Sequence, residues 1–206
     1  MTDGTCGGRL VVGLSGSLSA RSRTTALVSA AASGAAHRFG LRAQVLAMPD
    51  FLPSLGLAQS IADLDPVARA RLDTLLGAEA LVIGTPVYKG SYTGLFKHLF
   101  DLIDPPDLAG KPVLLVATGG GEKHALVIEH QLRPLFGFFE AATLPTGVYA
   151  TDTDCVAGAL QSGAVEERLE RAIEQFGPFL SRSGQPRAAT DDPAQRRVEL
   201  AHRKAT

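Results

Sequence analysis

Apolar runs of strand length alternate along this chain with longer segments of helical character. The runs cover residues 9–14, 41–46, 80–84, 112–117 and 144–149, and the central ones are apolar almost without interruption. Strands that are covered on both faces have this pattern, whereas half-exposed antiparallel strands alternate apolar with polar residues. The alternation therefore predicts a parallel sheet that lies between helices.

The helical segments are 24–39, 66–76, 95–103, 123–139 and 163–180. Five strands that alternate with five helices predict an α/β fold, a flavodoxin-like doubly wound sandwich with helices on both faces. The expected five-stranded parallel sheet has the order 2-1-3-4-5. Ligands of such sheets bind beyond the carboxyl ends of the strands, where the strand order reverses. The loops after the first, third and fourth strands are therefore the candidate site.

Composition favours one soluble domain. The chain has 206 residues, 45% of them hydrophobic, and we expect the domain to span 9–180. Residues 1–8 are expected to be a disordered lead-in, and the polar segment 181–206 is expected to be disordered or an oligomer arm. The net charge of −1 argues against nucleic acid and anionic membranes as partners. Without a signal peptide or an apolar span, we expect a cytoplasmic protein.

The cysteines and histidines do not suggest a metal site. Cys6 and Cys155 have no CxxC neighbour, and we expect both to be unpaired thiols. The five histidines show no metal-ligand spacing, and no GxSxG nucleophile motif occurs. We therefore expect no metal and no catalytic acid, base or nucleophile.

The loop after the first strand, GLSGSLSARSRTT, is rich in hydroxyl groups. It lacks the lysine of a P-loop and the GxGxxG of a dinucleotide fold, but it runs into a helix that begins near Ser22. Hydroxyls and free N–H groups at a helix N-terminus form a site for one terminal phosphate, and Arg21 could add a charged contact. Helix capping alone would explain one or two hydroxyls, with Ser22 as the N-cap. The loop contains six within eleven positions, which favours a phosphate site.

The loops after the third and fourth strands are suited to a flat ring. In GTPVYKGSYTGLFKHLFD, Pro86–Lys89 offers a backbone edge, and Tyr88 or Tyr92 offers an aromatic wall. An ordinary turn whose tyrosines cover the core remains an alternative. In ATGGGEKHA, three consecutive glycines present backbone donors without side chains, although a surface turn would also use glycines. The expected emergence of all three loops from one sheet edge favours a binding site.

These residues resemble a known family. SGSLSARSRTT, GTPVYKGSYTGLFKHLFDLI, ATGGGEKHALVIEHQLRPLFGFFEA and TGVYATDTD are similar to segments of the NAD(P)H-dependent FMN reductases of the flavodoxin-like fold. The likeness is strongest to reductases that supply reduced flavin to alkanesulfonate and methanesulfonate monooxygenases. It implies FMN and NADPH or NADH as cofactors, a flavin-dependent monooxygenase as partner, and a homodimer or homotetramer.

The resemblance also implies roles for individual residues. The FMN phosphate would be bound by Ser15, Ser17, Arg21, Ser22, Thr24 and Thr25. The isoalloxazine ring would be lined by Pro86, Val87, Tyr88, Lys89, Thr118, Gly119, Gly120 and Gly121, with Tyr92 near the ring or the subunit boundary. His130 occupies the position of an inserted residue that opens a π-bulge at the tetramer interface in sulfonate-linked relatives. A functional role for His130 and simple solvation are both open.

Three functions follow from this resemblance and from the residues. The first is an FMN reductase that transfers a hydride from NAD(P)H to FMN and releases FMNH2 to a monooxygenase in sulfonate metabolism. Such a transfer needs stacked rings about 3–3.5 Å apart and no protein acid or base. The second is an FMN-bound quinone, azo-dye or metal-oxyanion reductase. The third is a flavodoxin-like electron carrier, which the balanced net charge disfavours.

Overall fold

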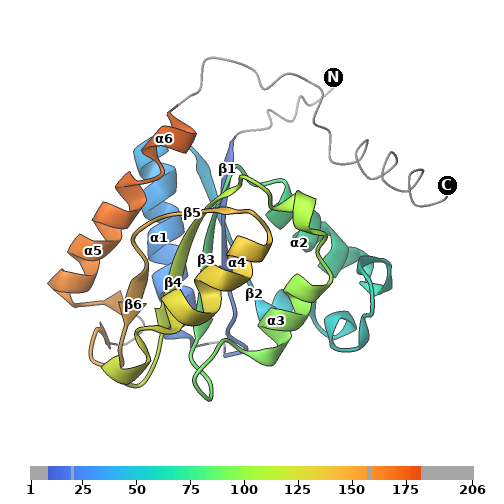
Figure 1. The fold of residues 1–206 in the computed structure, drawn as a ribbon, viewed down its shortest axis with the longest axis horizontal. Helices are drawn as coiled ribbons and strands as arrows, with labels where there is room; N and C mark the ends of the chain where they lie inside the picture. The colour runs from blue at the N-terminus through green and yellow to red at the C-terminus, as the bar shows by residue number, and fades with distance from the viewer. Residues whose placement is uncertain (1–8, 20, 157–158, 182–206) are drawn as a thin grey trace.

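The computed structural model describes residues 9–19, 21–156 and 159–181. The expected lead-in 1–8, which contains Cys6, lies outside these residues, as does segment 182–206 of the expected tail. The described chain forms a parallel sheet between two helical layers (Figure 1). None of the described helices is both long and apolar enough to cross a membrane.

The sheet confirms the predicted strand order. Its strands are β1 (Leu10–Ser15), β2 (Arg42–Ala47), β3 (Ala80–Pro86), β4 (Pro112–Thr118), β5 (Ala142–Thr143) and β6 (Val148–Ala150). The order is β2-β1-β3-β4, and β5 and β6 each pair with β4, all in parallel. Strands β3 and β4 are buried along almost their whole length, as expected for strands that are covered on both faces.

The fifth strand position is split in two, which the sequence did not predict. The expected strand 144–149 is replaced by β5 and β6, with a gap between them. Pro145 has no N–H to give to the ladder, and the Thr146 N–H donates instead to Gln175 Oε1 at 2.9 Å. The ladder along β4 is therefore interrupted for these residues and resumes at Val148.

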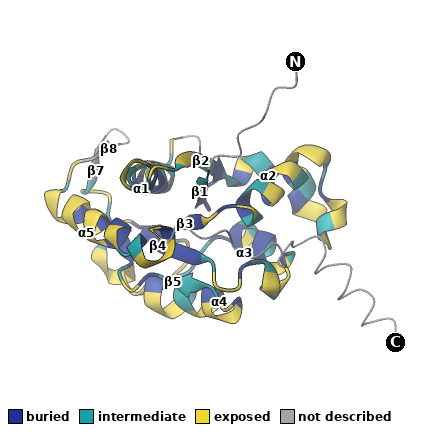
Figure 2. Ribbon diagram, turned by 90° about the horizontal axis from the view of Figure 1, so that it is seen from above, coloured by how far each residue is buried: buried dark blue, intermediate teal, exposed yellow. Residues whose placement is uncertain are grey.

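Helices cover both faces of the sheet. One core cluster packs α1 (Arg23–Phe39), α5 (Gly163–Glu174) and α6 (Gly177–Leu180) against the sheet. The other packs α2 (Pro66–Leu76), α3 (Gly94–Asp101) and α4 (Arg133–Phe138) against the opposite face. Figure 2 shows the buried residues concentrated between these layers and the exposed residues on their outer sides.

Two predicted helices are interrupted. Segment 163–180 is divided into α5 and α6, because Pro178 lacks an N–H and its ring would clash with the carbonyl four residues earlier. Segment 123–139 is not one regular helix: it contains a 3-10 turn (Glu122–His124), a π-helical segment (Ile128–Leu132) and α4. The π-helical segment contains His130, where the resemblance implied a π-bulge, whereas the 3-10 turn and the break before α6 were not predicted.

Several short elements were not predicted. Three 3-10 turns, Met48–Phe51, Ser54–Leu57 and Ile61–Asp63, connect β2 to α2, and another, Pro105–Asp107, precedes β4. A small antiparallel pair, β7 (Cys155–Val156) and β8 (Ala159–Leu160), follows β6. Each is too short to show a periodic pattern in the sequence.

Helix α1 packs closely on the sheet at Gly13 and Gly84, and its N-terminus lies at the strand ends. A Cβ at Gly84 would lie 2.4 Å from Val28 Cγ2, and a Cβ at Gly13 would lie 2.6 Å from Val28 Cγ1. Glycine at both positions therefore allows the helix to pack on β1 and β3. Ser22 caps the helix by accepting a hydrogen bond from the Thr25 N–H at 3.1 Å.

Candidate functional site

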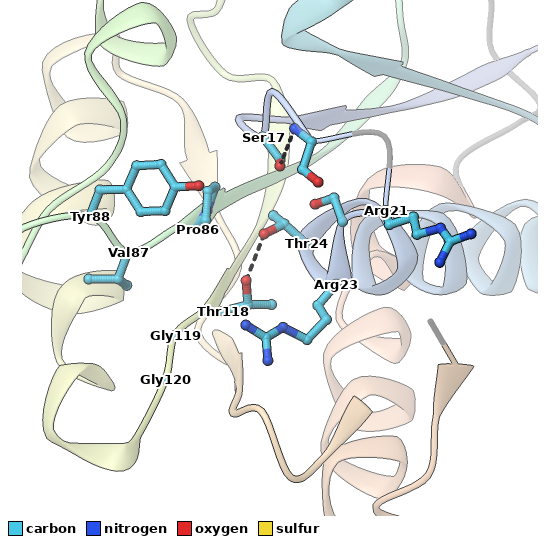
Figure 3. Close-up of a pocket in the computed structure, with 12 residues that line it drawn as sticks. Ser17, Arg21, Arg23, Thr24, Pro86, Val87, Tyr88, Thr118, Gly119 and Gly120 are labelled. Carbon is cyan, nitrogen blue, oxygen red and sulfur yellow. Dashed lines mark hydrogen bonds between the residues drawn. The ribbon is translucent and has the colours of Figure 1, made fainter. Parts of the chain in front are cut away.

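A cavity of about 310 Å³ lies where β1, β3 and β4 end. The register sets Ser15 level with Gly84, and Pro86 level with Thr118, so these three carboxyl ends lie side by side. The cavity is lined by Ser17, Ser19, Arg21, Ser22, Arg23, Thr24, Pro86, Val87, Tyr88, Thr118, Gly119 and Gly120. Figure 3 shows Tyr88 and Val87 on one side of this group and Arg21 on the other. The three predicted loops thus meet at one site.

Hydroxyl groups organise the first loop. The buried Ser15 Oγ accepts hydrogen bonds from Thr25 Oγ1 at 2.8 Å and from the Ser17 N–H at 3.4 Å. Ser17 Oγ accepts in turn from the Ser19 N–H at 3.1 Å. These bonds curl the loop over the N-terminus of α1, where the helix dipole favours negative charge. Ser17 and Ser22 line the cavity at this end.

The three loops are tied together by a few hydrogen bonds. Thr24 Oγ1 and Thr118 Oγ1 lie 2.6 Å apart and share a hydrogen bond between the first and third loops (Figure 3). The Val87 N–H donates to the Thr118 carbonyl at 2.8 Å, which joins the second loop to the third. Thr93 Oγ1 donates to the Gly16 carbonyl at 2.9 Å, which joins the second loop to the first. These hydrogen bonds therefore join the three loops at the cavity to one another.

The second loop forms a tight hairpin. Tyr88 and Ser91 exchange backbone hydrogen bonds of 2.9 and 3.2 Å, and the two residues between them, Lys89 and Gly90, have φ of 53° and 84°. Two successive left-handed residues are what a two-residue type I′ turn requires. Tyr88 lines the cavity and is 58% exposed, so its side chain is available to cover a flat ligand.

The third loop is hydrogen-bonded to Tyr149 of β6. Its hydroxyl donates to the Gly121 carbonyl at 2.7 Å, and a Cβ at Gly119 would lie only 2.3 Å from that hydroxyl. Glycine is therefore required at position 119 if Tyr149 is to reach the loop. Burial, and to a smaller extent the Asp152 carboxylate, raises the pKa of the Tyr149 hydroxyl, so it stays protonated as a donor at neutral pH.

The charged groups at the cavity are two arginines and one neighbouring aspartate. Arg21 and Arg23 line the cavity, and Arg23 forms an ion pair with Asp152 from the loop after β6. Both partners of this pair are about half exposed. With the N-terminus of α1, the arginines make this end of the cavity suitable for an anion.

The structure brings most of the predicted site residues together. Those that line the cavity are Ser17, Arg21, Ser22, Thr24, Pro86, Val87, Tyr88, Thr118, Gly119 and Gly120. Ser15, Thr25, Lys89, Tyr92 and Gly121 do not line it.

Each of these five residues lies outside the cavity lining and has a different position or contact. Ser15 and Thr25 bond to each other and brace the first loop, and the exposed Lys89 occupies the hairpin turn. Tyr92 packs against the core, with its ring centroid 5.7 Å from that of Phe96. Gly121 accepts the Tyr149 hydrogen bond.

Ser19 and Arg23 line the cavity but were not among the predicted binding residues. Ser19 was counted among the six hydroxyls of the first loop without a role of its own. Arg23 is the first residue of α1, a position next to the cap, and this position was the signal that could have identified it.

His130 lies in the middle of the π-helical segment Ile128–Leu132, and its side chain is exposed. The backbone N–H of His130 donates to the Leu126 carbonyl at 2.9 Å. The carboxylate of the preceding Glu129 receives two hydrogen bonds from Arg133, of 2.6 and 2.9 Å. His130 is therefore outside the cavity, on the outer surface of this chain.

The cavity combines two chemistries. One end offers hydroxyls, helix N–H groups and guanidinium groups for an anion, and the other offers backbone edges, a proline and an exposed tyrosine for a flat ring. Among the described residues, no group of His, Cys, Asp and Glu is arranged to hold a metal ion. The arrangement is suited to a ligand that carries a phosphate at one end and a heteroaromatic ring at the other.

Comparison with known proteins agrees with this chemistry. The family model described as NADPH-dependent FMN reductase matches residues 10–154. The NADH-dependent FMN reductase SfnF of Pseudomonas fluorescens (strain Pf0-1) is 44% identical over 170 residues, which cover 82% of this chain and 91% of that protein. The FMN reductase (NADPH) of Pseudomonas aeruginosa is 42% identical over 170 residues, with the same coverage of each chain.

A solved structure shows the same likeness in three dimensions. The apo form of the NADH:FMN oxidoreductase EmoB superposes with a TM-score of 0.70 at 27% identity, covering 91% of this chain and 98% of that one. The sequence match, the strand order and the cavity agree with one another. The chain therefore belongs to the family of NADPH-dependent FMN reductases, which are oxidoreductases that use FMN with NAD(P)H.

Proposed function

We propose that this reductase takes FMN as an exchangeable substrate and supplies FMNH2 to a flavin-dependent monooxygenase in the cytoplasm, in the metabolism of sulfonates. Reduction of FMN by NAD(P)H is the activity of the family, and exchange and delivery are the proposed additions. The resemblance of the loop segments to sulfonate-linked reductases supports this choice of partner.

The observation that carries the proposal is the shape of the cavity. Its volume of about 310 Å³ is at the lower end of the roughly 300–1,000 Å³ of pockets that enclose most of a drug-sized ligand. At the phosphate end, Ser15 and Ser17 are buried and hydrogen-bonded, whereas at the ring end Tyr88 is exposed. One chain would therefore hold the phosphate firmly and leave a face of the ring accessible to a nicotinamide or to exchange.

The residues present fit FMN. Ser17, Ser22 and Arg21 would hold the terminal phosphate at the N-terminus of α1. The backbone of Pro86–Tyr88 and of Gly119–Gly120 would hydrogen-bond the polar edge of the ring. When bound, FMN supplies the hydride-accepting chemistry. The contribution of the chain is then to orient the ring and to keep one of its faces clear.

The open ring end also favours completion of the site by a second copy of this chain. The exposed Tyr88, Leu126 and Phe138 provide apolar surface on the second loop and on the helix after β4. We propose a homodimer or homotetramer in which His130, exposed in the π-helical segment, lies at the subunit boundary.

Flavin content and flavin dependence test the proposal together. We expect the purified protein to be colourless or pale, and to oxidise NADH or NADPH only when FMN is added. After anaerobic reduction, FMNH2 should pass into the outer chamber of a dialysis cell, because the reduced flavin is released. Both nicotinamide cofactors are to be tested, since the two relatives are named for different ones.

Two outcomes would contradict the proposal. A protein that is stoichiometrically yellow and reduces quinones or azo dyes without added flavin would be an FMN-bound reductase instead. A protein that holds FMN but oxidises neither NADH nor NADPH would be an electron carrier.

A further inference from the structure

The hairpin that carries Tyr88 is firmly attached at its base. The Val87 N–H is bonded to the Thr118 carbonyl at 2.8 Å, and Thr93 Oγ1 is bonded to the Gly16 carbonyl at 2.9 Å. Between these points, Tyr88 and Ser91 exchange hydrogen bonds with each other. Those bonds shape the hairpin without fixing its angle to the rest of the molecule.

One side-chain hydrogen bond attaches the hairpin to the neighbouring π-helical segment. Ser91 Oγ donates to Gln131 Oε1 at 3.1 Å, and both residues are half-buried. Within the described residues, this is the hydrogen bond that joins the hairpin from Tyr88 to Ser91 to the π-helical segment Ile128–Leu132.

Gln131 is itself held in place. Its neighbours in the segment, Ile128 and Leu132, are buried in the core. Directly after them, Arg133 donates to the Leu144 carbonyl at 2.9 Å and to Thr143 Oγ1 at 3.1 Å, which attaches the segment to the edge of the sheet. The amide of Gln131 is therefore a fixed point against which the hairpin is aligned.

We propose that Gln131 is a positioning residue for the flavin ring, acting through Ser91 on the hairpin that presents Val87 and Tyr88. The inference rests on the proposed binding of the ring at this hairpin. It assigns a role to the π-helical segment within one chain: the segment sets the ring end of the site while the α1 loop sets the phosphate end. Loss of the Ser91–Gln131 bond should weaken contacts to the ring and leave contacts to the phosphate intact.

A double-mutant cycle tests this role. We expect Gln131→Ala and Ser91→Ala each to raise the Kd for FMN about three- to tenfold, the effect of losing one neutral hydrogen bond. The double variant should be no weaker than either single variant, because both remove the same bond. Gln131→Glu keeps an oxygen that accepts from Ser91 and should restore most of the affinity. Gln59→Ala and Ser33→Ala, at exposed positions outside the cavity, are the matched controls.

Riboflavin separates this role from general damage to the site. It carries the ring without the phosphate, so Gln131→Ala should weaken riboflavin and FMN by the same factor. A variant of the phosphate loop, Ser22→Ala, should weaken FMN alone. If Gln131→Ala does not fold, the Ser91→Ala variant, altered at a partly exposed hairpin residue, carries the same comparison.

Three results would overturn the inference. They are unchanged flavin affinity in both single variants, additive losses in the double variant, and a loss confined to FMN. If the unmodified protein fails to bind FMN at all, the proposed function fails first. If the unmodified protein binds FMN and the variants bind it with the same Kd, only the proposed role of Gln131 is wrong.

Discussion

Arg23 has two possible partners at the mouth of the cavity. It lines the site at the N-terminus of α1, and it is paired with Asp152, a residue from the loop after β6. The pair is about half exposed, where an ion pair contributes about 0–1 kcal/mol. A phosphate dianion at the helix terminus would therefore compete with Asp152 for the guanidinium at small cost.

Removing the Asp152 carboxylate should strengthen the binding of FMN through its phosphate. We expect Asp152→Asn to lower the Kd for FMN about two- to fivefold at low ionic strength, with a smaller difference at high salt. Riboflavin, which lacks the phosphate, should bind as before. Titrations followed by flavin fluorescence measure both, and Asp73→Asn, which removes the partner of Arg69 on α2, is the matched control. Weaker FMN binding in Asp152→Asn would show that Asp152 supports the site instead.

Individual hydroxyls show how far the sequence could identify ligand contacts. The six hydroxyls of the first loop indicated an anion site, and four of them, Ser17, Ser19, Ser22 and Thr24, belong to residues that line the cavity. Ser15 and Thr25 instead bond to each other, at 2.8 Å. Residue type indicates that hydroxyls are present, but only the curvature of the loop determines which ones face the ligand and which brace the backbone.

Among the elements, the π-helical segment and α4 are joined by a local ion pair. Arg133 donates two hydrogen bonds to Glu129 at the junction of the π-helical segment and α4. The hydrogen bonds from Arg133 hold the pKa of Glu129 below its usual range, and the same contact raises the pKa of Arg133. Because the folded protein lowers the pKa of Glu129, the pair stabilises the fold only while that carboxylate is ionised.

This pair should give a distinct pH dependence. Its stabilisation is fully present above the usual pKa of Glu129, near 4.5, and is lost as the pH falls through the lowered value. At neutral pH, we expect Glu129→Gln to reduce the free energy of unfolding by about 1 kcal/mol or less, as for other partly exposed pairs. The difference from the unmodified protein should shrink towards about pH 3.

Urea denaturation at the two pH values measures this difference. The control Glu170→Gln replaces an exposed carboxylate on α5 and should not reproduce the effect. An equal loss of stability at both pH values would show that Glu129 acts through packing and not through its charge.

Element boundaries show where sequence patterns stop being informative. The long, uninterrupted apolar strands β3 and β4 were predicted with only small shifts of their ends. The break in the fifth strand depends on Pro145 and on a bond from Thr146 to Gln175, a residue distant in sequence. From the residues alone, segment 123–139 has an ordinary helical pattern, because Ile128, Leu132 and Phe136 are spaced as in any buried helix face. Only the resemblance to the FMN reductases indicated a π-bulge at His130, and the π-helical segment contains this residue.

At the scale of the whole molecule, topology assembles the site. The order β2-β1-β3-β4 reverses between β1 and β3, and the loops that follow β1, β3 and β4 meet beyond that point. Gly13 and Gly84 let α1 pack closely enough to bring its N-terminus to the same edge. The alternating pattern of strands and helices predicted this arrangement, and the position of the cavity followed from it.

We propose that one cavity binds a phosphate through the α1 loop and a flavin ring through the other two loops. The ratio of the Kd values for riboflavin and FMN, measured by fluorescence titration of the purified protein, tests it most directly. The charge-assisted contacts of a phosphate at the α1 terminus predict that FMN binds at least about tenfold more tightly than riboflavin. Equal affinities for the two flavins, or no binding of either, would show that the cavity does not bind FMN in this way.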